Sequence, residues 1–130
     1  MLFRSKDVTL ICHSQTVAVA LKAADQLALQ GVSAEVLDLR SLRPMDERAI
    51  LTSVAKTNRA VVVEEGWPHC GVGAQVVDVI QRDAFDQLDA PVLRVTQADA
   101  PMPYNKQLER LAKPSPEKVV AAARRVLYLD

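Results

Sequence analysis

The stretch RAVVVEEGWPHCGVGAQVVDVI, residues 59–80, contains in order an apolar strand, a polar corner and an apolar helix face. Arg59–Glu64 is expected to be a strand covered on both faces, because its centre, AVVV, is apolar on successive residues. The apolar residues that follow recur at helical spacing: Val76, Val77, Val79 and Ile80. A buried strand followed by an amphipathic helix is the repeating unit of parallel α/β sheets, so this stretch predicts the fold class.

The same alternation of strand and helix runs through the rest of the chain. Further strands are expected at Val8–Cys12, Ala34–Leu39 and Pro91–Thr96. Asp46 and Ser115 are expected to cap the helix after the second strand and the last helix. The last helix should bury four residues: Val119, Val120, Ala123 and Leu127.

Strands that are apolar on both faces and separated by amphipathic helices predict a three-layer α/β/α domain with a mostly parallel sheet. Right-handed crossovers then favour the strand order 2-1-3-4, with the switch point between strands one and three. Two polar segments, Cys12-His13-Ser14 and Glu65–Cys70, follow these two strands. Both are therefore expected at the edge of the sheet where open α/β sheets usually bind ligands.

The composition of the whole chain excludes several classes of protein. The 130 residues form one ordinary domain, 1–130, and 16 basic residues balance 16 acidic ones. We therefore expect neither nucleic acid nor a membrane surface as a partner. The N-terminal residues MLFRSKD contain no apolar signal region, and two cysteines do not make a disulfide framework. A cytoplasmic location is expected.

The glycines of the corner allow two interpretations. Gly71-Val72-Gly73 begins like a dinucleotide-binding fingerprint, but Val76 stands where the third small residue belongs. Alternatively, the glycines let the backbone turn tightly and bring the helix close to the sheet, which we favour. A metal site is not expected, because Cys12-His13 and His69-Cys70 are sequence neighbours, and neighbours on a strand point to opposite faces.

Two further alternatives place chemistry at the switch point. Cys70 is a candidate thiol nucleophile with His13 as base and Glu65 as orienting group, although no thiol-hydrolase signature surrounds it. The chain is also a candidate for a freestanding α/β domain that binds a small anion or nucleotide between strands one and three.

The segment ADAPMPY, Ala98–Tyr104, is expected to be a stiff extended loop, because two of its residues are prolines. A loop of this kind loses little chain entropy on binding and suits a rigid interface. Met102, Tyr104 and Trp67 are large side chains that favour anchoring a partner over facing water.

Three runs of sequence resemble one family: DLRSLRPMD, VVVEEGWPHCGVGAQ and LDAPVLRVTQADAPMPYNKQLERLA. They look like the C-terminal domain of the beta subunit of thiamin-diphosphate-dependent 2-oxo acid dehydrogenases of the pyruvate dehydrogenase type, with the transketolase C-terminal fold. The resemblance extends from about Asp7 to Leu127. Gln97 and Ala100 depart from it, standing where Gly and Val are usual. The antiparallel edge strand of the family would precede Asp7 and is expected to be missing or truncated in MLFRSK.

The resemblance implies assembly and not catalysis. Thiamin diphosphate and magnesium would belong to the parent enzyme, whose cofactor-binding domains we expect to lie outside this chain, so the chain alone is expected to be inactive. The implied partners are the alpha subunit and a second beta subunit of a heterotetramer, and the subunit-binding domain of an acyltransferase core. No catalytic, cofactor or metal residue is expected, and the interface candidates are Trp67, His69, Met102, Tyr104 and Asp130.

Overall fold

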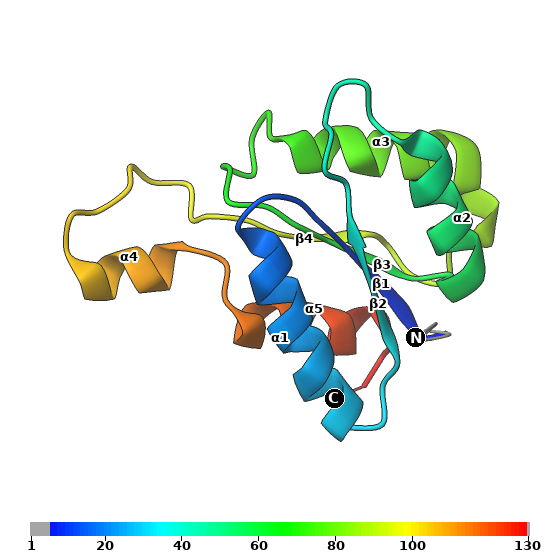
Figure 1. The fold of residues 1–130 in the computed structure, drawn as a ribbon, viewed down its shortest axis with the longest axis horizontal. Helices are drawn as coiled ribbons and strands as arrows, with labels where there is room; N and C mark the ends of the chain where they lie inside the picture. Colours follow the sequence, from blue (N-terminus) through cyan, green and yellow to red (C-terminus); the bar gives the residue numbers. More distant parts are fainter. Residues whose placement is uncertain (1–5, 130) are drawn as a thin grey trace.

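Parallel strands form a four-stranded sheet in the order β2-β1-β3-β4 in the computed structural model, which describes residues 6–129 (Figure 1). The elements in chain order are β1 (Val8–Cys12), α1 (Thr16–Leu29), β2 (Ala34–Asp38), α2 (Glu47–Thr57), β3 (Ala60–Val63), α3 (Val72–Ala84), the 3-10 turn η1 (Phe85–Gln87), β4 (Leu93–Val95), α4 (Lys106–Ala112) and α5 (Pro116–Val126). The predicted strand order and the three-layer fold class are confirmed.

Side chains of the two central strands pack in two separate cores, because successive side chains point to opposite faces of the sheet. Leu10 of β1 packs in the core beneath α1 and α5, whereas Ile11, its neighbour, packs in the core beneath α2 and α3. Val61 and Val62 of β3 divide in the same way. The two central strands are therefore buried along their whole length, as their unbroken apolar sequences predict.

Side-chain caps begin the helices where the sequence predicts them. The carboxylate of Asp46 accepts the backbone N–H of Ala49 at 3.0 Å, and the hydroxyl of Ser115 accepts that of Lys118 at 3.3 Å. One detail of α5 differs from the prediction. Val126 is buried with the other apolar residues of the helix, whereas Leu127 is the C-cap and is only partly buried.

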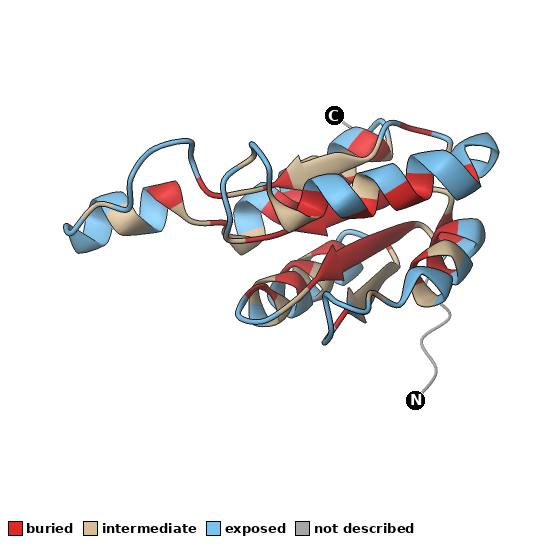
Figure 2. Cartoon of the chain, turned by 90° about the horizontal axis from the view of Figure 1, so that it is seen from above, coloured by how far each residue is buried: buried red, intermediate tan, exposed pale blue. Residues whose placement is uncertain are grey.

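The segment that joins β4 to α5 projects from the body of the domain (Figures 1 and 2). We name residues 98–114, which include α4, the arm. The N–H of Ala98 donates to the carbonyl of Ala112 at 2.8 Å and closes the neck of the arm. An extended loop was predicted at Ala98–Tyr104, but the helix Lys106–Ala112 that follows it was not predicted.

Two predictions concern residues beyond the described range. The family's antiparallel edge strand was expected to be missing or truncated in MLFRSK, of which Met1–Ser5 lie outside the described residues, and so does the interface candidate Asp130. Within residues 6–129, no helix is both long enough and apolar enough to cross a bilayer.

Candidate functional site

The corner, residues 64–75, is built around a buried ion pair between β3 and β4. The side chain of Glu64 is 2% exposed, and its Oε1 lies 2.5 Å from Nη2 of Arg94. Its other oxygen accepts the N–H of Gly73 at 2.7 Å, in the first turn of α3. The Nη1 of Arg94 donates to the carbonyl of Pro68 at 2.7 Å. Two side chains thus tie together both strands, the corner and the start of α3.

The glycines of the corner make room for this ion pair. A Cβ on Gly73 would lie 2.7 Å from Oε1 of Glu64 and 2.9 Å from Nε of Arg94. A Cβ on Gly71 would lie 2.6 Å from the carbonyl oxygen of Trp67 and 2.7 Å from Oε1 of Glu64. Larger residues at either position would displace the ion pair or the backbone. The prediction that these glycines allow a close approach is confirmed, and the fingerprint interpretation is not needed.

The same contacts argue against an anion site at the switch point. The N-terminus of a helix attracts anions through its free N–H groups and its dipole. At α3 that place is taken by the carboxylate of Glu64, which bonds the N–H of Gly73. At α1 the N–H groups of Thr16 and Val17 donate to the carbonyls of His13 and Ser14. Several N–H groups at both helix N-termini therefore already have partners within the chain.

The cysteines do not assemble into a reactive site. Burial, and then the charge of Asp38, raises the pKa of the Cys12 thiol to about 12, so this group stays neutral at physiological pH. Cys70 is exposed, and within residues 6–129 no hydrogen bond joins it to His13 or Glu65. The structure therefore does not support Cys70 as a nucleophile activated by His13 and Glu65. No cluster of three or more potential metal ligands occurs in the same residues.

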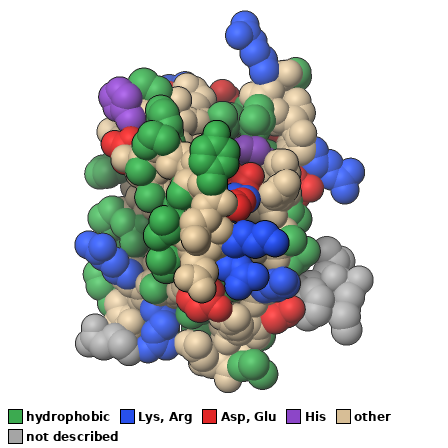
Figure 3. Space-filling model, turned by 90° about the vertical axis from the view of Figure 1, so that its left-hand side faces the viewer, with side chains coloured by type: hydrophobic (Ala, Val, Ile, Leu, Met, Phe, Trp, Pro, Cys, Tyr) green, Lys and Arg blue, Asp and Glu red, His purple; other side chains and the backbone are tan. Residues whose placement is uncertain are grey.

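Four of the five predicted interface residues are exposed, two on the corner and two on the arm. Trp67 is 50% exposed, Met102 41%, and Tyr104 extends fully into solvent. His69 is exposed as well. The N–H of Gln97, at the base of the arm, donates to the carbonyl of Gly66 in the corner at 3.1 Å. Figure 3, which views the molecule from the side of the arm, shows hydrophobic side chains gathered along this face.

Two further exposed apolar side chains of the arm were not predicted from the sequence. Leu108 and Leu111 of α4 are 53% and 71% exposed. Their spacing of three residues after the cap Asn105 was the available signal, because it places them on one side of a short helix. Glu109, and more weakly Glu65 of the corner, raises the pKa of the Lys113 ammonium at the C-terminal end of α4.

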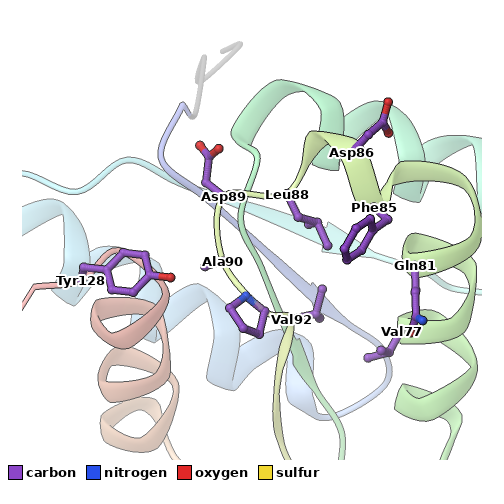
Figure 4. A pocket seen from close by; sticks show the side chains of 10 residues that line it. Val77, Gln81, Phe85, Asp86, Leu88, Asp89, Ala90, Val92 and Tyr128 are labelled. Carbon is purple, nitrogen blue, oxygen red and sulfur yellow. The ribbon is translucent and has the colours of Figure 1, made fainter.

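A second surface feature is a groove of about 670 Å³ between the end of α3, the start of β4 and the C-terminal end of α5 (Figure 4). Phe85 and Leu88 line one side of it and Tyr128 the other. Phe85 is 70% exposed and Tyr128 69%. Two carboxylates, Asp86 and Asp89, lie along the groove, and Asp89 pairs with Arg59 at 3.6 Å. The groove is therefore mainly apolar, with the carboxylate of Asp86 on its rim and that of Asp89 compensated by Arg59.

Comparison with known proteins gives a consistent set of matches. The family model for the C-terminal domain of transketolase matches residues 2–119. The pyruvate dehydrogenase E1 component subunit beta-1, mitochondrial, of Oryza sativa subsp. japonica is 51% identical over 95% of this chain, and the alignment covers 33% of that protein. The E1 subunit beta of Rhizobium meliloti (strain 1021) is 45% identical over 95% of this chain and 27% of its own length. The chain thus spans about a third of the length of the curated relatives it matches.

Solved structures of the same fold were found as well. A split-gene transketolase, described as an inactive beta4 tetramer, aligns over 96% of this chain and 39% of its own, with a TM-score of 0.83 and 30% identity. A 2-oxoglutarate:ferredoxin oxidoreductase from Magnetococcus marinus aligns over 95% of this chain and 18% of its own. Its TM-score is 0.64 at 17% identity, so it supports the fold alone.

Proposed function

The chain belongs to the transketolase C-terminal domain family, in the form found in pyruvate dehydrogenase E1 beta subunits, and we propose that it is the assembly domain of such a subunit. The parent reaction would be the oxidative decarboxylation of a 2-oxo acid, with transfer of the acyl group to a lipoyl arm. The observation that carries the proposal is the closed switch point. Between β1 and β3, the hydroxyl of Thr16 donates to the carbonyl of Val63 at 3.0 Å. On the other side of β3, the N-terminus of α3 is occupied by the carboxylate of Glu64, which pairs with Arg94.

The described residues do not fit thiamin diphosphate. A diphosphate would seek free N–H groups at a helix N-terminus or a metal held by clustered carboxylates. The N-terminus of α3 already bonds Glu64. We therefore assign the cofactor and its magnesium to other domains of the parent enzyme, and derive no step through them in this domain.

The corner and the arm are proposed as the interface with neighbouring subunits. Trp67, His69, Met102 and Tyr104 are exposed there, and Leu108 and Leu111 extend the apolar surface. Apolar side chains of this size on exposed loops favour burial against a partner. The alpha subunit and a second beta subunit are the partners we propose. The related split-gene transketolase is itself described as a beta4 tetramer, which is consistent with an assembling fold.

The groove beside Tyr128 is proposed as the docking site for the subunit-binding domain of the acyltransferase, which the family resemblance describes as small and basic. The groove offers apolar walls and the carboxylates of Asp86 and Asp89, so its chemistry is complementary to such a partner. Asp130, an interface candidate from the sequence, lies outside the described residues. For the location we retain the cytoplasm as a proposal, with mitochondria as the alternative that the names of several relatives suggest.

Removing the charge of Asp86 from the groove should weaken binding of the subunit-binding domain. In the intact subunit, Asp86→Asn should lower the affinity for the isolated subunit-binding domain about tenfold, because a charge-assisted contact is lost at a partly exposed site. Calorimetric titration at low and high salt measures the effect, and the variant should also lose part of the salt dependence. Asp25→Asn, on the exposed face of α1, is the matched control and should bind like the wild type. Equal affinity and equal salt dependence for both variants would remove this docking site.

The proposed function is tested by domain exchange. The corresponding C-terminal part of the Rhizobium meliloti E1 subunit beta, 45% identical to this chain, can be replaced by this chain and combined with its alpha subunit. The hybrid should assemble and turn over within about tenfold of the parent, since the domain supplies interfaces and no reacting group. A hybrid that assembles fully but shows no decarboxylation would contradict the proposal.

A further inference from the structure

Lys118 is a basic residue in the first turn of α5, where acidic residues are preferred. It is the third residue of this helix, which begins at Pro116 after the cap Ser115. This is the position where a capping box has Glu or Gln, since an acidic side chain there bonds the cap and favours the positive helix end. A lysine at this position is unfavourable for α5 itself. A residue that destabilises its own helix often makes a contact with another part of the molecule.

The ammonium group of Lys118 makes that other contact at the end of α4. Its Nζ donates to the carbonyl of Leu111 at 2.6 Å and to that of Lys113 at 2.9 Å. These carbonyls lie in and just after the last turn of α4, which ends at Ala112. A cation at the C-terminal end of a helix is stabilising, because it bonds carbonyls that lack helical partners. Lys118 is thus a cap for α4 supplied by α5.

Little else holds the direction of the arm. A pocket of about 640 Å³, lined by Leu111, Pro114 and Pro116 among others, lies in the angle between α4 and α5. Of the seven residues of α4, Ala112 is the one that is buried. Apart from Lys118, the neck is closed by the hydrogen bond between Ala98 and Ala112. Of residues 98–114, Ala112 and Pro114 alone are buried, so side-chain packing fixes the base of the arm and not the rest of it.

We propose that Lys118 is a positioning residue that holds the arm in its projecting orientation before a partner binds. The inference rests on the proposed assembly function, because the arm carries Tyr104, Leu108 and Leu111 to the partner. We call the contact of Lys118 with the end of α4 the clamp. A surface that is ordered in advance loses less entropy on association, so the clamp favours binding without touching the partner. The partner is a neighbouring subunit with an apolar recess for these side chains.

Hydrogen exchange of the intact subunit tests the clamp directly. The N–H groups of Glu109 and Lys113 are bonded within the arm, to the carbonyls of Asn105 and Glu109. In Lys118→Met and Lys118→Glu these amides should exchange about tenfold faster, as charge-assisted bonds to the end of α4 are lost. Lys118→Arg should restore slow exchange. Lys22→Met, on the exposed face of α1, should change nothing in the arm.

The glutamate variant separates a clamp from a merely structural role. Lys118→Glu completes a capping box with Ser115, so the thermal midpoint of the domain should stay the same or rise while the arm loosens. Arm exchange that is unchanged in both Lys118→Met and Lys118→Glu would overturn the clamp. Faster exchange with unchanged subunit association would leave the clamp standing and instead contradict the proposed role of the arm in assembly.

Discussion

Glu64→Ala should lower the free energy of unfolding of this domain by about 3 kcal/mol, the lower end of the range for breaking a buried ion pair. The substitution leaves the guanidinium of Arg94, whose side chain is 21% exposed, without its carboxylate. It also removes the acceptor of the Gly73 N–H. The partial exposure of Arg94 is the reason for choosing the lower end, since water can reach part of the group. Urea denaturation followed by circular dichroism measures the loss.

Two further variants test whether this loss of stability comes from the buried ion pair. Glu64→Gln keeps the volume and one acceptor, so it should cost less than the alanine variant. Asp78→Ala removes an exposed ion pair to Arg82 at 3.7 Å, and should cost under about 1 kcal/mol, as exposed pairs do. A loss in Glu64→Ala as small as that in Asp78→Ala would mean that the corner is not organised by the Glu64–Arg94 pair.

Removing two large side chains from the arm should weaken subunit association strongly. Tyr104→Ala and Leu111→Ala in the intact subunit should each raise the dissociation constant about 30-fold, the effect of losing about 2 kcal/mol at an interface hot spot. Both side chains are exposed in the isolated domain, so their removal should leave its unfolding midpoint unchanged. Sedimentation velocity over a range of concentrations measures the association.

Leu29→Ala is the matched control for the arm variants. Leu29 is 90% exposed at the end of α1, outside the corner and the arm. The Leu29→Ala variant should associate like the wild type. If the arm variants also remain assembled at the lowest concentration at which the wild type does, the arm is not an interface.

Much of the fold could be predicted because its signals are local. The apolar strands, the caps Asp46 and Ser115 and the order of the strands follow from periodicity and from the handedness of crossovers. Helix α4 was missed because seven residues carry too short a pattern, and such a helix is marginal without its context. Leu127 was predicted on the buried face of α5 in place of Val126 because both follow Ala123 at helical spacing.

The site was harder to predict because its contacts are long-range. Glu64 and Arg94 are 30 residues apart in sequence, and no spacing rule pairs them. Their contact needs β3 and β4 to be neighbours in the sheet, so it follows from the topology and not from the corner's own sequence. Likewise, Lys118 can be understood only after α4 is known to end beside it. The glycines, in contrast, were interpreted correctly because their effect is on the local backbone.

We propose that this domain assembles the parent enzyme and supplies no reacting group. The most direct test is the turnover of the intact enzyme as a function of subunit concentration, compared between the wild type and the double variant Tyr104→Ala/Leu111→Ala. We predict the same kcat at saturating concentration and a half-saturating concentration at least about 100-fold higher, as expected when only binding is lost. A kcat at saturation that falls by about 10³ with unchanged half-saturation would instead place the arm in the catalytic machinery and contradict the account.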